Sequence, residues 1–265
     1  ASDAACNAVT TGNWSAGGNW SGCSGAGGVP DATDDITINS GVIMTVDSAA
    51  VANSIVVATS SSAVTGNGIV INSGQTLAVT GSVFMNPPTA LTSLIDVGAG
   101  TLTAASISIT GSATASRFAS ISISTGTTTL SGSVVFTGTA AQARFIFTST
   151  GRLNIAGNFG SGGTLTTTSN GTINFNGSIA QTIGTYATYN NIEINNTSGG
   201  VSFISTATFL GTLTVTTGTL TFNTSAITIT GATTIASGAS LVLGVAAGAK
   251  TFIGLVTIDN GGTWS

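Results

Sequence analysis

Apolar and small polar residues alternate along most of this chain. From Asp35 onward, Ile, Leu, Val or Phe recurs at every second position of short runs, with Thr, Ser or Asn in between. Examples are Ile36-Thr37-Ile38, Ile107-Ser108-Ile109, Ile173-Asn174-Phe175 and Leu220-Thr221-Phe222. A period of two with β-branched residues is typical of strands that bury one face. Gly-Ser, Gly-Thr and Asn-Gly steps predict short turns between them, so we expect an all-β protein.

Charged residues are scarce in these strands. The 265 residues include 4 Lys or Arg and 8 Asp or Glu, which is 5% of the chain, and the net charge is −4. Average soluble domains devote about 25% of their residues to charged side chains. Antiparallel sandwiches usually expose such side chains and need hairpins and crossover loops. A parallel β-solenoid needs only short turns, and it stacks equivalent residues about 4.8 Å apart, where like charges repel each other. We therefore predict a parallel β-solenoid, or β-helix.

The solenoid prediction defines an inward-facing apolar set. Its members are Ile107, Ile109, Ile121, Ile123, Phe145, Phe147, Leu153, Ile155, Ile173, Phe175, Phe203, Leu213, Val215, Ile227, Ile229, Leu241, Leu243, Val256 and Ile258. A Gly-Thr-Leu-Thr motif begins at Gly100, at Gly163, which is 63 residues later, and at Gly211, a further 48 residues on. These offsets suit three and two coils of about 20–24 residues. Roughly ten coils would make a rod near 50 Å long.

The first 35 residues differ from the rest. They contain both cysteines, Cys6 and Cys23, in a Ser-, Gly- and Asn-rich segment with two of the three tryptophans. A close, isolated pair of cysteines predicts one disulfide formed in an oxidising compartment, and two free thiols are the alternative. Closing this loop would stabilise the fold by roughly 3 kcal/mol. We expect residues 1–35 to form a disulfide-closed N-terminal cap and residues 36–265 to form the solenoid repeats.

Other features favour export to the cell surface or beyond. The chain begins Ala1-Ser2-Asp3 without a methionine, as a mature protein does after its signal peptide is removed. A bilayer span needs roughly 20 uninterrupted apolar residues. Residues 42–58 come nearest, but Thr45, Asp47 and Asn53 interrupt them. We therefore expect a secreted, extracellular protein without a transmembrane segment.

The composition argues against several activities. Histidine is absent and there are two cysteines, which excludes imidazole catalysis and zinc sites built from His or several Cys. Four basic residues cannot provide a nucleic-acid-binding surface. Asp31, Asp34 and Asp35, with Asp47 nearby, do not have the spacing of a calcium loop, and turn formation explains them. Because the other acids are isolated, we expect no enzyme, no metal site and no cofactor.

Threonine pairs could provide a binding surface. Thr-x-Thr occurs at residues 101/103, 164/166, 212/214, 214/216, 219/221 and 228/230. A flat ladder of such pairs could order water or contact a sugar lattice, although Thr is also simply a favourable exposed strand residue. Tyr186 and Tyr189, beside Phe203 and Phe209, could form a carbohydrate platform, but filling a wider coil is the simpler interpretation.

Longer stretches resemble the repeats of large secreted bacterial surface proteins. They are Asn13-Trp14-Ser15 with Asn19-Trp20-Ser21, then Asp34-Asp35-Ile36-Thr37-Ile38, and then Ile173-Asn174-Phe175-Asn176-Gly177-Ser178 with Tyr189-Asn190-Asn191-Ile192-Glu193-Ile194. In these stretches the chain resembles adhesin-like β-solenoid repeats over most of its length. The resemblance implies a structural or adhesive role and transfers no catalytic residues.

The expected function is that of an extracellular structural protein, a stiff unit of a surface adhesin, fibre or self-assembling filament. A glycan- or ice-binding module on a Thr-rich face is the alternative, and a polysaccharide-acting enzyme is a distant third. Residues 254–265 contain no Pro and no charge after Asp259, so no C-terminal cap is predicted. We expect Leu255, Val256, Ile258 and Trp264 to form an assembly edge, covered by further coils or by a neighbouring subunit. Self-association could be end-to-end or lateral.

Overall fold

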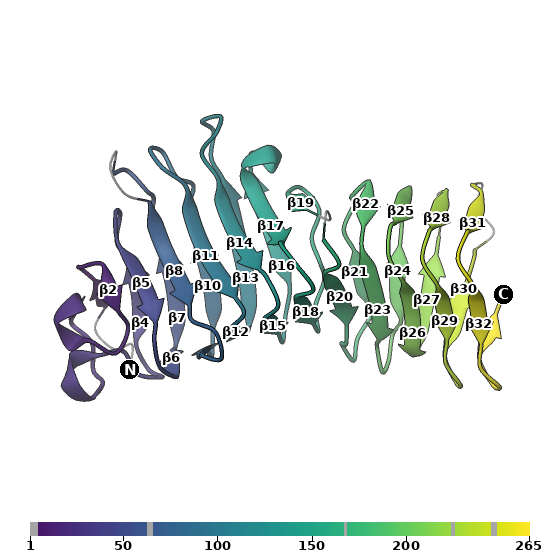
Figure 1. Cartoon of the computed structure of the whole chain (residues 1–265), viewed down its shortest axis with the longest axis horizontal. Coiled ribbons are helices and arrows are strands. Elements are labelled where there is room, and N and C mark those ends of the chain that lie inside the picture. Colours follow the sequence, from purple (N-terminus) through teal and green to yellow (C-terminus); the bar gives the residue numbers. More distant parts are fainter. Residues whose placement is uncertain (1–4, 63–65, 167–168, 224–225, 245–247) are drawn as a thin grey trace.

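The computed structural model describes residues 5–62, 66–166, 169–223, 226–244 and 248–265, so the expectation drawn from residues 1–3 lies outside the described part. Short strands wind into an elongated rod of about nine turns, with the two termini at opposite ends (Figure 1). Described strands pair in parallel from coil to coil, and the one antiparallel pair joins β1 to β3. The described helix is limited to the 3-10 turns η1 (Gly17–Asn19), η2 (Ala26–Gly28) and η3 (Ala140–Gln142). The predicted parallel β-solenoid is confirmed.

Three faces, named A, B and C in the order in which each coil visits them, run along the rod. Face A contains β3 (Trp20–Ser21), β1 (Cys6–Ala8), β4 (Asp35–Ile38), β7 (Ser54–Val57), β10 (Ser82–Met85), β13 (Ser106–Gly111), β16 (Val134–Gly138), β21 (Gln181–Ile183), β24 (Val201–Phe203), β27 (Thr219–Phe222), β30 (Ser240–Val242) and β33 (Thr263–Trp264). Phe159 bridges the two parts of face A by pairing with Val134 and Ile183.

Faces B and C follow in each coil. Face B contains β2 (Gly12–Asn13), β5 (Ile43–Val46), β8 (Asn67–Ile71), β11 (Ser93–Gly98), β14 (Ala119–Ile123), β17 (Ala143–Phe147), β19 (Thr164–Thr166), β22 (Thr188–Tyr189), β25 (Ala207–Phe209), β28 (Ile227–Ile229) and β31 (Lys250–Phe252). Face C contains β6 (Ala50–Ala52), β9 (Thr76–Val79), β12 (Thr101–Ala104), β15 (Thr127–Leu130), β18 (Arg152–Ile155), β20 (Thr172–Phe175), β23 (Asn191–Asn195), β26 (Leu213–Thr217), β29 (Thr233–Ile235) and β32 (Val256–Ile258).

Alternation places every second side chain inside the rod. The predicted inward set is buried from Ile107 through Leu241. Its last three members are less covered: Leu243 and Val256 are half-buried, and Ile258 is 45% exposed. Val256 and Ile258 pair with the buried Thr233 and Ile235 and so keep the inward register. They are accessible because no further described coil covers them.

Aromatic rings fill the core of the C-terminal half. Tyr189 lies 5.5 Å from Phe203 and 5.6 Å from Phe209, measured between ring centroids. Both Tyr186 and Tyr189 are buried, and their hydroxyls donate to the carbonyls of Gly160 and Gly184. Burial, the largest cause, raises the pKa of each phenol well above its usual range. These tyrosines fill the coil and do not form an external sugar platform.

The Gly-Thr-Leu-Thr motif does not mark one position of the coil, and this part of the repeat prediction was wrong. Thr164–Thr166 forms β19 on face B, whereas Thr101–Ala104 and Leu213–Thr217 lie on face C. Register shows that coil length varies: Ile36 pairs with Ile55 and Ile55 with Val83. These partners are 19 and 28 residues apart, so offsets of 48 and 63 do not correspond to whole coils. Each corner requires a turn and each face alternates, so similar motifs arise on all three faces.

A buried threonine in this core gives a testable prediction. Thr128 is fully buried between Leu102 and Leu153 of the adjacent coils, and within the described structure its hydroxyl has no hydrogen-bond partner. We expect Thr128→Val to raise the free energy of unfolding by about 1 kcal/mol, because it removes an unpaired buried hydroxyl. Denaturant titration measures this change. The outward-facing Thr103→Val should stay within about 0.5 kcal/mol of the parent, and a destabilised T128V would contradict the prediction.

Candidate functional site

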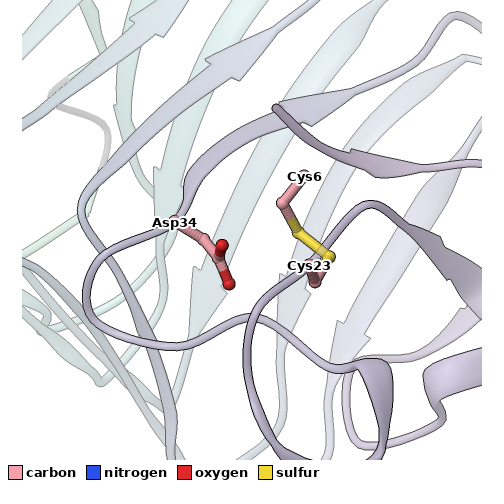
Figure 2. Close-up of side chains that lie close together, drawn as sticks. All are labelled: Cys6, Cys23 and Asp34. Carbon is pink, nitrogen blue, oxygen red and sulfur yellow. A yellow bond between two sulfur atoms is a disulfide. The ribbon is translucent and has the colours of Figure 1, made fainter. Parts of the chain in front are cut away.

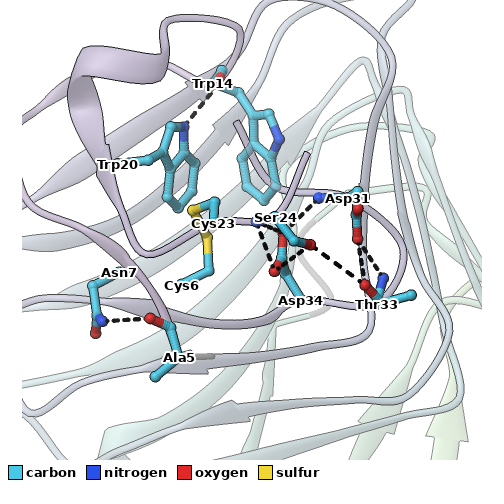
Figure 3. Close-up of a disulfide and its surroundings, with 10 residues drawn as sticks. All are labelled: Ala5, Cys6, Asn7, Trp14, Trp20, Cys23, Ser24, Asp31, Thr33 and Asp34. Carbon is cyan, nitrogen blue, oxygen red and sulfur yellow. Dashed lines mark hydrogen bonds between the residues drawn. A yellow bond between two sulfur atoms is a disulfide. The ribbon is translucent and has the colours of Figure 1, made fainter. Parts of the chain in front are cut away.

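The N-terminal end of the rod is covered by its own chain. β1 pairs in parallel with β4, and β2 pairs with β5, so both continue the ladders of the solenoid. On its other side β1 pairs antiparallel with β3, which occupies the edge of face A. Trp14 and Trp20 are buried with their ring centroids 4.8 Å apart, and the Trp20 indole donates to the Trp14 carbonyl at 2.8 Å (Figure 3). β3 thereby covers the outer edge of β1, while β3, β2 and β6 are the terminal described strands of the three faces at this end.

A disulfide joins Cys6 and Cys23, as predicted, and their Cα atoms are 4.4 Å apart. It ties β1 to the segment that follows β3. The carboxylate of Asp34 lies beside the two sulfurs (Figure 2). This buried group accepts hydrogen bonds from the backbone and hydroxyl of Ser24, at 3.1 and 2.9 Å, and from the Asp31 amide at 2.8 Å. The two sulfurs are bonded to each other, and the carboxylate is hydrogen-bonded. The cluster therefore has a structural role, which is to hold the segments of the N-terminal cap together.

The other N-terminal acids accept hydrogen bonds at three separate places: Asp31 within its own turn, and Asp35 and Asp47 from segments distant in the sequence. Asp31 accepts from Thr33, Asp35 from Ser54, and Asp47 from Ser15. These hydrogen bonds from hydroxyl groups are the main reason why the pKa of each carboxyl is lowered from 3.8. Among the described residues, the one cluster of three Cys, Asp or Glu ligand groups is Cys6, Cys23 and Asp34. The four aspartates therefore do not converge on a calcium site.

The C-terminal end of the rod is open. Phe252 and Trp264 pair with the buried Ile229 and Leu241 of the preceding coil. Together with Val256, Ile258 and the charged Lys250, which pairs with the buried Ile227, they form the inward side of the last coil, here called the end plate. The Phe252 and Trp264 rings are 4.6 Å apart. In the described structure no strand pairs with the outer side of β31, β32 or β33.

Three of the four predicted edge residues belong to the end plate: Val256, Ile258 and Trp264. Leu255 does not, because it precedes β32 at a corner, where it is 74% exposed and Ile253 is 65% exposed. Phe252 was missed, because alternation places it on the same side of β31 as the charged Lys250, which gives no reason to expect that side to face inward. The end plate and this corner together make the least covered apolar region of the last coil.

The threonine pairs do not build a single face. Residues 101/103, 212/214 and 214/216 lie on face C, 164/166 and 228/230 begin on face B, and 219/221 lies on face A. The middle of face C instead carries a charged and amide cluster. Arg152 contacts Glu193 at 2.6 Å. Asn174 donates to Asn154 and accepts from Asn195, at 2.9 Å each.

Comparison of the chain with protein-family models, with curated proteins and with solved structures finds no match in any of the three. Within the described residues, no helix is both long enough and apolar enough to cross a membrane. The class of protein that the structure defines is thus an all-β parallel solenoid with an N-terminal disulfide.

Proposed function

We propose that this chain is an extracellular structural protein, a stiff β-solenoid unit of a surface adhesin, fibre or self-assembling filament. The open end plate carries the proposal. Unpaired strand edges recruit further strands, and the inward side chains at this end lack the cover that buries equivalent residues elsewhere in the rod. The next coil, from the same chain or from another, would cover Ile258 and Trp264 and extend the three ladders.

The remaining architecture supports the same role. Each inner coil is hydrogen-bonded to both neighbours, and an apolar core continues along the rod. This arrangement distributes load over many backbone hydrogen bonds, and backbone paired in this way resists proteolysis. The disulfide supports an oxidising, extracellular location. The proposal assigns no catalysis, because the carboxylates of Asp31, Asp34, Asp35 and Asp47 are each engaged by Ser or Thr hydroxyls of the chain itself.

Association of the 265-residue chain through its end plate is the testable consequence. We expect the purified chain to form particles longer than one rod, visible by electron microscopy. Ile258→Lys should abolish these lengthened particles while leaving any side-by-side association in place, because a further positive charge on an end plate that already carries Lys250 would be buried by the next copy without a partner. Thr257→Lys is the matched control, since this side chain lies on the outward side of the same strand and is already exposed.

Mass photometry over a range of concentrations measures the outcome. A wild-type chain that stays monomeric would refute end association of this chain, as would an I258K variant that assembles as the wild type does. Circular dichroism should show the same strand content in all three proteins, which separates lost association from lost folding.

Glycan binding on face C is a second candidate function, favoured by the cluster around Arg152 and Glu193. Planar amide, guanidinium and carboxylate groups are suited to hydrogen bonds with sugar hydroxyls. Side chains of these two residues remain 36% and 24% exposed. Glycan-array binding that is lost in Arg152→Ala, but kept in the face C variant Thr103→Val, would favour this function; no binding by the wild type would remove it.

A further inference from the structure

An apolar hollow lies on the outside of face B in the N-terminal half of the rod. It has a volume of about 230 Å³ and is lined by Ile43, Gly66, Asn67, Gly68, Val70, Thr92 and Leu94. Gly68 stands in the ladder between Ile43 and Leu94, so a side chain is missing where the neighbouring coils carry large ones. A Cβ atom at Gly68 would come within 1.8 Å of the Leu94 carbonyl oxygen. A larger residue therefore cannot replace Gly68 unless the Leu94 backbone moves. This close approach of β8 to β11 keeps the hollow open.

The lining offers little to orient a polar ligand. The amide of Asn67 already donates to the Ala58 carbonyl and accepts from the Ser93 hydroxyl, and none of the lining residues is charged. Small-molecule sites usually combine an apolar wall with a few directed polar groups. A rigid apolar side chain from a protein surface fits this hollow better.

The adjacent face carries such a side chain. Phe84 points outward from β10 and is 45% exposed, and it is the one aromatic residue among the exposed large hydrophobic residues of the described structure. Its ladder neighbours on face A are Val56 and Ser108, which are uncharged. A cavity of about 150 Å³ can hold a benzene ring, so the hollow is large enough for this phenyl group.

We propose that Phe84 of one copy inserts into the face B hollow of a second copy, so that rods associate side by side. This inference rests on the proposed structural role and specifies its lateral contact. Both surfaces are apolar and uncharged at the contact, so no ion must be desolvated. A rigid aromatic anchor seated in a pocket is the usual centre of a protein interface.

The position of the two features determines how copies would add. Because Phe84 and the hollow lie on different faces, the contact is heterologous, and each copy keeps a free Phe84 on one side and a free hollow on the other. Such contacts generate rings or open arrays. The outward side chains of faces A and B around the two features would supply the surrounding contact area.

Single variants in the Ile258→Lys background test this contact without end association. Phe84→Ser removes the anchor, and Leu94→Lys places a charge on the rim of the hollow. Sedimentation velocity should show concentration-dependent association of the parent that each variant weakens at least about tenfold. Val135→Ser is the matched control, because Val135 is a 44% exposed residue of the same face, and it should associate as the parent does. Unchanged thermal unfolding would show that the variants are folded.

Mixing the two variants gives the decisive result. The F84S protein keeps an intact hollow and the L94K protein keeps an intact Phe84, so an equimolar mixture should form a one-to-one heterodimer and grow no further. A parent that remains monomeric, an F84S variant that associates as the parent does, or a mixture without heterodimers would each overturn the proposal. If L94K alone lost binding of an apolar dye while F84S associated normally, the hollow would be a small-molecule site. End association is tested separately, by comparing the wild type with I258K. A negative result for the lateral contact would therefore not refute association through the end plate.

Discussion

Replacing Phe203 with Ala is expected to lower the free energy of unfolding by about 3–5 kcal/mol. Phe203 is 1% exposed and touches three other rings: its centroid is 5.5 Å from that of Tyr189, 5.4 Å from Phe209 and 6.0 Å from Phe222. These four rings are here called the aromatic column. Alanine at position 203 would leave a cavity in the middle of it. The ladders above and below restrain the backbone, so little collapse can refill it.

Equilibrium denaturation followed by circular dichroism would measure this loss. Ser202→Ala is the matched control, because Ser202 lies outward on the same strand, and we expect it to stay within about 0.5 kcal/mol of the wild type. Phe203→Leu should fall between the two. Equal stability of F203A and S202A would show that the aromatic column does not hold the C-terminal half together.

The strands and their inward sides could be predicted from the sequence because alternation is a local signal. Ile107 and Ile109 repeat at a spacing of two, and a strand with that spacing can bury only one side. The scarcity of charge then separated a solenoid from an antiparallel sandwich. The disulfide was equally accessible, since the chain has no other cysteine for Cys6 or Cys23 to pair with.

The face on which each strand lies could not be predicted from alternation. A corner loop can grow without disturbing the ladders, and the segments between β7 and β8 and between β10 and β11 differ in length. Gly163 and Gly211 therefore look equivalent in the sequence but begin strands on different faces. The end plate was predicted only in part, because Phe252 shares its side of β31 with the charged Lys250, and its inward orientation follows from the pairing of β31 with β28, which the sequence does not record.

Buried polar residues are a second feature that could not be predicted from the sequence, and Gln181 is the clearest example. Alternation with Ile183 places Gln181 inward, but its side chain chemistry would favour the surface. It is 1% exposed, at the corner between faces C and A. Its amide oxygen accepts from the Gly177 backbone and from the Asn196 side chain, at 2.9 Å each, and its amide nitrogen donates to the Ile155 carbonyl at 2.9 Å. The glutamine thus satisfies the turn groups that the corner buries.

Gln181→Leu is accordingly expected to destabilise the fold by about 2–3 kcal/mol, even though it adds apolar surface to a core position. Leucine would leave the Gly177 N–H without its acceptor, at a cost of roughly 1–3 kcal/mol. It would also remove one hydrogen bond each from the Asn196 amide and the Ile155 carbonyl, which keep their bonds to the Ile179 carbonyl and the Asn176 amide. Thr182→Leu is the control, since Thr182 is exposed on the same strand and should change stability by no more than about 0.5 kcal/mol. Urea denaturation of both variants would decide between two models of the corner. A Q181L protein as stable as the wild type would mean that apolar packing alone holds it, whereas the expected loss, together with faster amide exchange at Gly177, would show that it depends on this one buried amide.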